Sequence, residues 1–169
     1  MMSLLGVILR FASERDAKGA SYEDLLERLD KNEEESLPHF ASAADTIINR
    51  ARAAHIIGIE RWGQSRLRTL LGEPLVMDEY DGYAPSTDLT TSELAAEFTR
   101  TRAATKALVQ ELQGNGISLS KTATHNELGD ISARAWIAYI TNHTRRESRV
   151  LTGVLSKIMG ALPSSVSMP

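Results

Sequence analysis

The sequence predicts an all-α fold, a four-helix bundle with a long crossover between its second and third helices. Apolar residues recur at helical spacing in four stretches, residues that cap helices bound these stretches, and no stretch shows strong strand alternation. The 169 residues are enough for one domain with a sizeable core. We expect an apolar N-terminal extension at 1–20, the bundle at 21–160 and a flexible tail at 161–169.

Capping residues mark the first two predicted helices. Ser21 begins the first helix, and Pro38 should bend it or end it. The second helix begins near Asp45 or Thr46, because such side chains accept hydrogen bonds from the free N–H groups of a first turn. It should stop at the Leu-Gly-Glu-Pro segment 71–74, where the glycine can adopt the left-handed conformation of a helix end.

The third predicted helix has the clearest start in the chain. Thr90 and Glu93 have the spacing of a capping box, and the Gly-Asn-Gly segment 114–116 should end the helix. The fourth helix begins near Asp130 or Ser132 and carries a long apolar stripe. Together, four amphipathic helices of this length predict a bundle.

The connection between the second and third helices, residues 73–89, is too long for a tight turn. About 17 extended residues reach roughly 55 Å, whereas a helix of about 25 residues spans roughly 38 Å, so the connection can cross the whole bundle. Residues 73–97 carry seven acidic residues and no basic one. We expect a lid over one end of the bundle, in which Tyr80 and Tyr83 make contacts. Four arginines are its expected neighbours and could instead hold a carboxylated substrate: Arg61, Arg66, Arg145 and Arg149.

Composition excludes several functions. The net charge is −3 and no segment is densely basic, which argues against nucleic acid as a partner. The apolar stretch 1–9 is too short to span a bilayer and has no basic region before it, so we expect neither export nor a membrane partner but a cytoplasmic protein. Cysteine is absent, so any metal must be held by nitrogen and oxygen ligands.

Two ionisable residues interrupt the apolar stripe of the fourth helix. His143 and Glu147 follow Trp136 and Ile140 on this face and are one helical turn apart, so both can reach a single point. A buried carboxylate needs a compensating charge or ion. His55 lies on the apolar side of the second helix, and two imidazoles with one carboxylate form a known ligand set for zinc or non-haem iron.

Simpler interpretations of these residues remain open. Glu147 could pair with Arg146, with Arg149 or with an arginine of the second helix, and His143 could be a hydrogen-bonded core histidine. Of the other polar candidates, three have structural interpretations. His39 is expected at the surface or as a cap, His125 in a structured loop, and Glu60 in an ion pair on its own helix.

The order of these motifs resembles the DinB/YfiT-like superfamily of bacterial four-helix proteins. The stretch HNELGDISARAWIAYITNHTRRES is similar to the family's His-x-x-(Leu/Phe)-Gly segment followed by the last helix with its H-x-x-x-H motif. The family's first histidine matches His55 in RAAHIIGIERWGQSRLRTLLGEP, and its second matches His143. The third falls at Glu147, where this chain departs from the three histidines. The resemblance covers roughly residues 22–158.

The resemblance implies one divalent metal ion, zinc or else nickel, iron or manganese, at His55, His143 and Glu147. It also implies a low-molecular-weight thiol as a second cofactor, a small-molecule substrate, and a thiol-dependent S-transferase, isomerase or hydrolase activity in a homodimer. Candidate residues for binding the thiol or substrate are Arg145, Arg66 and Tyr83. The alternative from another class is a metal-free dimeric helical module for binding or stress response.

Overall fold

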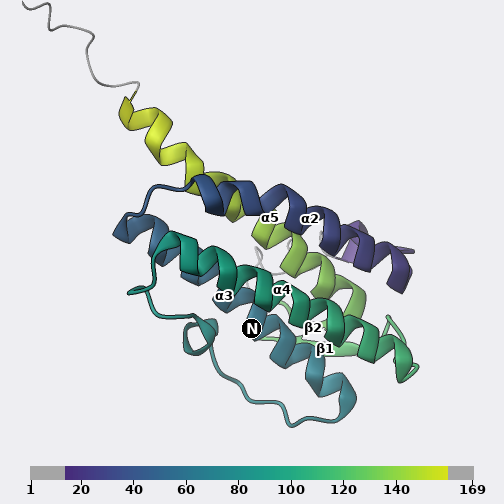
Figure 1. The fold of residues 1–169 in the computed structure, drawn as a ribbon. Coiled ribbons are helices and arrows are strands. Elements are labelled where there is room, and N and C mark those ends of the chain that lie inside the picture. The colour runs from purple at the N-terminus through teal and green to yellow at the C-terminus, as the bar shows by residue number, and fades with distance from the viewer. Residues whose placement is uncertain (1–13, 160–169) are drawn as a thin grey trace, which may run out of the picture.

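The computed structural model describes residues 14–159, with side chains as far as Leu151. Four long helices dominate it (Figure 1), namely α2 (Tyr22–Ser42), α3 (Ile47–Arg68), α4 (Thr91–Gly114) and α5 (Ala133–Met159). The shorter elements are the 3-10 helices η1 (Thr69–Leu71) and η2 (Tyr80–Tyr83), and the strands β1 (Thr122–His125) and β2 (Gly129–Ser132). The described chain is therefore mostly helical, in agreement with the predicted all-α class.

The predicted helix starts are confirmed by their hydrogen bonds. The Ser21 hydroxyl accepts from the Asp24 backbone N–H and the Asp24 carboxylate accepts from the Ser21 N–H, a reciprocal capping box. Thr90 and Glu93 form the same arrangement at the start of α4. Thr46 caps α3. Local sequence is sufficient to define these starts because each box satisfies backbone donors that the first turn leaves unpaired.

Helix α2 continues through Pro38 to Ser42, so the proline does not end the helix, which was one of its two expected effects. A proline inside a helix removes one backbone N–H and crowds the preceding turn. Packing offsets that cost here, since Phe40, just beyond Pro38, is buried and stacks on Phe98 of α4 with ring centroids 4.7 Å apart. The helix ends one turn past the proline, where the Ser42 hydroxyl donates to the Pro38 carbonyl.

The helices α3 and α4 run in the same direction, as the predicted crossover requires. The first N–H of α4, on Thr91, donates to Asp45 just before α3, and further along Gln64 donates to Thr105. In Figure 1 both helices start at the same end of the molecule, while the connection returns along the outer side of α3. Helix α2 packs against α4 and α5, and α3 packs against α4 and α5.

The acidic connection lies along the side of α3, which corrects its expected position as a lid over one end. Trp62 of α3 donates from its indole N–H to the Asp78 carbonyl. Gly58, one turn earlier, lets the connection approach closely, because a β-carbon there would be 3.1 Å from the Cα and Cβ of Ala84. The side of a helix offers more apolar surface than its end, and the two tyrosines of η2, Tyr80 and Tyr83, pack against that core.

A β-hairpin precedes α5, although no stretch of the sequence shows strong strand alternation. The pairing is antiparallel, from Thr122 with Ser132 to His125 with Gly129. Strands of four residues are too short for visible alternation, and Gly129 takes a positive φ of 68° that helps the chain to turn. Trp136 anchors the hairpin to α5 by donating its indole N–H to the Ala123 carbonyl.

The segment before α2 packs onto the helices from residue 14 onward. Ala17 is fully buried, the Glu14 carboxylate accepts from the Ser132 N–H and hydroxyl, and Asp16 accepts from the Asn142 amide. Residues 14–20, assigned to an extension from the sequence, are thus part of the packed structure. The apolar positions before them and the predicted tail at 161–169 lie outside the described residues.

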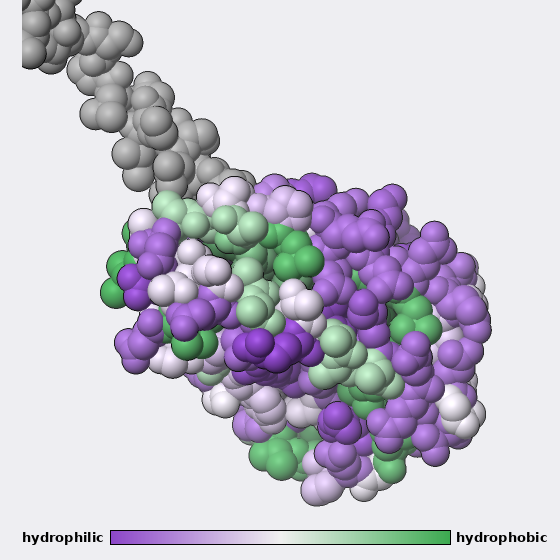
Figure 2. All heavy atoms as spheres, in the orientation of Figure 1, coloured by the Kyte–Doolittle hydropathy of each residue, from purple (hydrophilic) through white to green (hydrophobic). Residues whose placement is uncertain are grey.

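Polar side chains cover much of the face in Figure 2, with smaller apolar areas between them. Among the helices the structure describes, none combines the length and the apolar character needed to cross a membrane.

Candidate metal site

Two histidines from different helices meet between α3 and α5, with His143 buried and His55 partly exposed. His55 projects from the middle of α3 and His143 from the middle of α5, and their ring centroids are 5.1 Å apart. The two helices run antiparallel at this point, since Gly63 of α3 lies against Ile140 and Trp136 of α5. A β-carbon on Gly63 would be 2.7 Å from the Ile140 Cδ1, so the glycine allows the helices to come close. The structure therefore brings together two of the three predicted ligands.

Both imidazoles are held in the neutral form, which is the form that binds metal ions. Burial lowers the pKa of His143 to about 4, assisted by the neighbouring charges of His55 and Arg146. Burial also lowers the pKa of His55, against the opposing effects of Glu147 and Asp81. His143 is only 7% exposed, and its Nδ1 has no hydrogen-bond partner among the described residues. A buried nitrogen lone pair without a partner is an unusual and costly feature.

Glu147 is one turn beyond His143, but its carboxylate is engaged elsewhere. The Arg146 Nε lies 3.0 Å from the Glu147 Oε1, and the Glu147 side chain is 24% exposed. Partial burial acts to raise the pKa of Glu147, but the Arg146 hydrogen bond and the charges of His143, Arg146 and His55 outweigh it and hold that pKa below its usual range. Within the described residues, no three His, Asp or Glu side chains are gathered as a ready metal site.

The histidine pair nevertheless fits a metal ion. In a tetrahedral site with metal–nitrogen distances of about 2.0–2.1 Å, two imidazole centroids are roughly 5 Å apart, and the observed separation is 5.1 Å. The unpaired Nδ1 of His143 is a free ligand atom in this pair. Glu147 would complete a His₂–carboxylate set if its side chain turned from Arg146 toward the imidazoles, a move whose cost is low because exposed ion pairs contribute little.

Aromatic rings enclose the histidine pair. Tyr80 of η2 meets the His55 ring edge-on with centroids 5.0 Å apart, and Tyr139 lies one turn before His143 with centroids 6.2 Å apart. Burial raises the pKa of Tyr139 to about 12, so its hydroxyl stays protonated. The sequence analysis did not assign Tyr139 to the site, although its spacing of four residues from His143 would have indicated the same helix face.

His125 has the loop-structuring role expected of it. Its Nδ1 accepts from the backbone N–H groups of Glu127 and Leu128, which fixes the turn of the hairpin. Its ring packs against Trp62, Trp136 and Tyr139, so it lies behind the histidine pair rather than in it.

The three residues suggested for binding a thiol or substrate do not converge on the histidines. Arg66 is buried and bonded to the acidic connection through the carbonyls of Val76 and Asp78 and to the Asn126 side chain. The Tyr83 hydroxyl donates to the Asp78 carboxylate. Arg145 lines a separate cavity between α2 and α5. The expected contacts of the acidic segment 73–97 with two of the four arginines are thus present, since Arg66 pairs with Asp78 and Arg61 pairs with Glu97 at the end of that segment, within α4.

Glu60 corrects another expectation, that it pairs with an arginine of its own helix. It is fully buried, and its carboxylate accepts from Arg102 Nη2 at 2.9 Å and from the Thr105 hydroxyl at 2.7 Å, both on α4. The error arose because helical spacing predicts neighbours within a helix but not the residues that another helix places opposite.

Comparisons of the chain with protein-family models, with curated proteins and with solved structures find no match. Function is therefore inferred from the geometry of the chain's own residues.

Proposed function

We propose that this chain is a DinB-like four-helix-bundle protein that binds one divalent metal ion, zinc or else nickel, iron or manganese. His55 and His143 are its main ligands, and Glu147 is the third. One observation carries the proposal, namely that two neutral histidines from separate helices lie 5.1 Å apart with an unpaired nitrogen in the interior. Buried imidazole nitrogens are usually hydrogen-bonded; the Nε2 of His125 also lacks a partner, but within the described part of the chain His125 has no second histidine or carboxylate beside it.

The arrangement of the helices supports the family part of the proposal. Helices α3 and α4 are parallel and joined by the connection along α3, and the histidines come from the second and fourth long helices. Four long helices that pack pairwise in this way are consistent with a bundle whose ligand site lies between facing helices.

A bound divalent ion would supply Lewis acidity toward a thiol or a water molecule. The chain contains no cysteine, so a sulfur nucleophile would have to come from a low-molecular-weight thiol. Tyr80 and Tyr139 flank the two imidazoles and restrict the access of water to them. Glu147 carries negative charge close to the imidazoles, which would balance part of the charge of a cation. These features suit a metal-dependent transferase, isomerase or hydrolase that acts on a small molecule.

Metal content tests this proposal directly. Plasma mass spectrometry of the tag-free protein should find close to one equivalent of metal, or one equivalent after incubation with zinc. His143→Ala should abolish this binding and Glu147→Gln should weaken it by about tenfold or more. His39→Ala is the matched control, because that residue lies near the end of α2 and its loss should leave the metal content unchanged. A protein that stays empty in added zinc would refute the proposal.

The ion pair between Arg146 and Glu147 favours a second candidate, a metal-free dimeric binding module in which Glu147 is merely paired. The variant Arg146→Gln distinguishes the metal-binding protein from the metal-free binding module. If Glu147 is a ligand, removing its competitor should strengthen zinc binding severalfold; if the pair is the only role of Glu147, the substitution should change nothing. Thermal stability should stay nearly constant in both cases, because Arg146 is largely exposed. Light scattering on the same samples would test the expected homodimer.

A further inference from the structure

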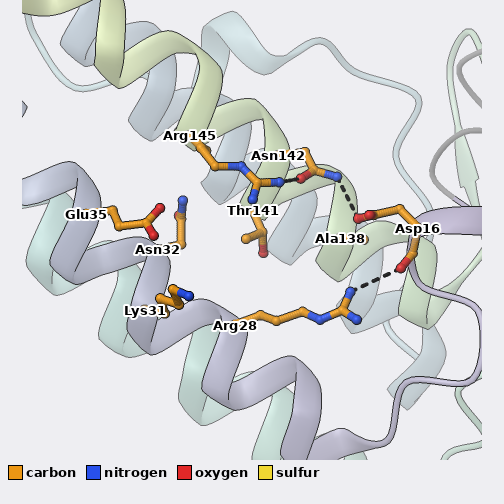
Figure 3. Close-up of a pocket in the computed structure, with 9 residues that line it drawn as sticks. All are labelled: Asp16, Arg28, Lys31, Asn32, Glu35, Ala138, Thr141, Asn142 and Arg145. Carbon is orange, nitrogen blue, oxygen red and sulfur yellow. Dashed lines mark hydrogen bonds between the residues drawn. The ribbon is translucent and has the colours of Figure 1, made fainter.

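A second polar site lies between α2 and α5, in a cavity of about 260 Å³. Its floor is buried and includes Asn32 of α2 and Thr141 of α5, whereas the charged side chains at its rim, such as Arg28 and Arg145, are exposed. Figure 3 shows the Asn32 side chain between the two helices, with charged groups around the opening. A buried polar floor under a charged rim is the form of a small-ligand site.

The side-chain amide of Asn32, which has no hydrogen-bond partner in the described part of the chain, points to a ligand in this cavity. The residue is 3% exposed, and neither its Nδ2 nor its Oδ1 has a hydrogen-bond partner among the described residues. The nearby Thr141 hydroxyl donates to the Ile137 carbonyl of its own helix, so it does not donate to the amide. Buried amides are almost always hydrogen-bonded, and the Asn32 residue lines the cavity.

The rim carries charged side chains of both signs that do not form ion pairs with one another. Lys31 and Glu35 are one turn apart on α2, yet among the described residues neither has an ion-pair partner. Arg28 donates to the Asp16 backbone carbonyl, and its charge also acts on the Asp24 carboxylate one turn earlier on α2. Arg145 donates to the Asn142 side chain, a neutral group.

Three cations, Arg28, Lys31 and Arg145, thus face two carboxylates, Asp16 and Glu35, so the lining carries a net charge of +1. The site is complementary to a ligand that carries both signs and a net negative charge.

We propose that this cavity binds a free α-amino acid, preferentially one with an acidic side chain. The side-chain amide of Asn32 offers one donor group and one acceptor, which suit the carboxylate and the ammonium group of such a ligand. The rim arginines bind its carboxylates and Glu35 binds its ammonium group. At about 30 Å³ per water, the cavity holds on the order of nine waters, which is the space of a ligand of about ten non-hydrogen atoms such as glutamate.

This site is independent of the proposed metal site. His143 faces α3 and contacts His55, whereas Thr141 and Arg145 face the cavity beside α2. The two sites therefore use different faces of α5, and each can be absent without affecting the other.

Calorimetric titration of the full chain tests the proposal with three probes: L-glutamate, glutarate, which lacks the ammonium group, and inorganic phosphate. L-Glutamate should bind at one molecule per chain, and glutarate and phosphate at least about tenfold more weakly. Asn32→Leu should weaken L-glutamate binding by about tenfold or more without lowering the melting temperature, because it removes the unpaired amide. Arg145→Gln, at the exposed rim, should also weaken it.

Arg100→Gln on α4 is the matched control, since it removes one exposed positive charge away from the cavity and should leave binding unchanged. No saturable L-glutamate binding up to about 10 mM would overturn the proposal. Equal binding of glutarate or phosphate would overturn the amino-acid assignment, and unchanged binding in both Asn32→Leu and Arg145→Gln would overturn the location. His143→Ala should bind L-glutamate as the unaltered protein does, whatever becomes of metal binding.

Discussion

Two polar clusters on α3 differ in the charges that their members carry. Between α3 and α4, Glu60 and Arg102 are fully buried and form an ion pair at 2.9 Å, and Thr105 donates to the second carboxylate oxygen of Glu60. Between α3 and α5, His55 and His143 are neutral and one of their nitrogens has no partner. Both clusters include polar groups of α3 that face another helix, but Glu60 and Arg102 are fully buried whereas His55 is partly exposed.

The two clusters also differ in which of their groups remain available to a ligand. Both carboxylate oxygens of Glu60 accept hydrogen bonds from α4, so the carboxylate holds helices together and offers nothing to a ligand. The histidine pair retains an unpaired nitrogen and the flanking carboxylate of Glu147. A buried nitrogen without a partner occurs in both clusters, on Arg102 Nε and on His143 Nδ1, so the partly exposed carboxylate of Glu147 is what distinguishes the histidine pair.

Breaking the Glu60–Arg102 pair should have the largest effect on stability. Arg102→Ala leaves a buried carboxylate without its cation and should cost about 3–5 kcal/mol in the free energy of unfolding, measured by urea titration. The double variant Glu60→Gln with Arg102→Met should recover part of this loss, because no charge is left unpaired. A loss below about 1 kcal/mol for Arg102→Ala would show that the pair does not hold α3 to α4.

Acid should destabilise the protein through its buried histidines. Burial lowers the pKa of His125 from 6.5 to about 4 in the folded state. A histidine with a lowered pKa stabilises the fold above pH 6.5, and this contribution is lost as the pH falls from 6.5 to about 4. The loss expected from His125 alone is about 3 kcal/mol.

Unfolding measured at pH 7 and near pH 4 in the unaltered protein and in His125→Gln gives the contribution of His125 as a difference between the two proteins. That difference is needed because the pKa of His143 is also lowered to about 4 and adds to the total loss. The variant should lose about 3 kcal/mol less than the unaltered protein over this range. Equal losses would contradict a buried, neutral His125.

Gly58→Ala should disturb the wall of the histidine pair and spare the Glu60–Arg102 pair. Its new methyl group would lie 3.1–3.2 Å from the Ala84 backbone, so the connection that carries Tyr80 must shift away from α3. We expect a cost of about 1–3 kcal/mol, read from thermal unfolding. Gly82→Ala is the matched control in the same connection, since nothing lies within 4 Å of its new methyl group and it should be nearly neutral. Similar losses in both variants would argue against close packing at Gly58.

The sequence was sufficient for features that depend on nearby residues. Three such features follow from local chemistry or chain length, and all are present: the capping boxes at Ser21 and Thr90, the left-handed Gly72 (φ 101°) that ends η1 just after α3, and the long crossover. The meeting of His55 and His143 was also predicted, because both lie on apolar faces of helices expected to pack together.

Features that depend on contacts between helices were missed. The partner of Glu60 on α4, the position of the acidic connection along α3, and the unpaired Asn32 depend on rotations and registers of helices that spacing does not encode. The hairpin at β1 and β2 was missed because its strands are too short to show a period. For Glu147 the sequence left two alternatives open, a place beside the histidines or an ion pair with a nearby arginine, and the structure shows the pair with Arg146.

The central claim is that His55 and His143 bind a metal ion while the other polar clusters serve the fold. Histidine side-chain NMR during a zinc titration tests it most directly, because the four histidines of one protein are compared in one sample. The account predicts that ring signals of His55 and His143 shift together and saturate at one equivalent of zinc, while those of His39 and His125 stay in place. Two results would contradict this claim: the signals of all four histidines move in proportion to added zinc without saturation, or none of the signals moves.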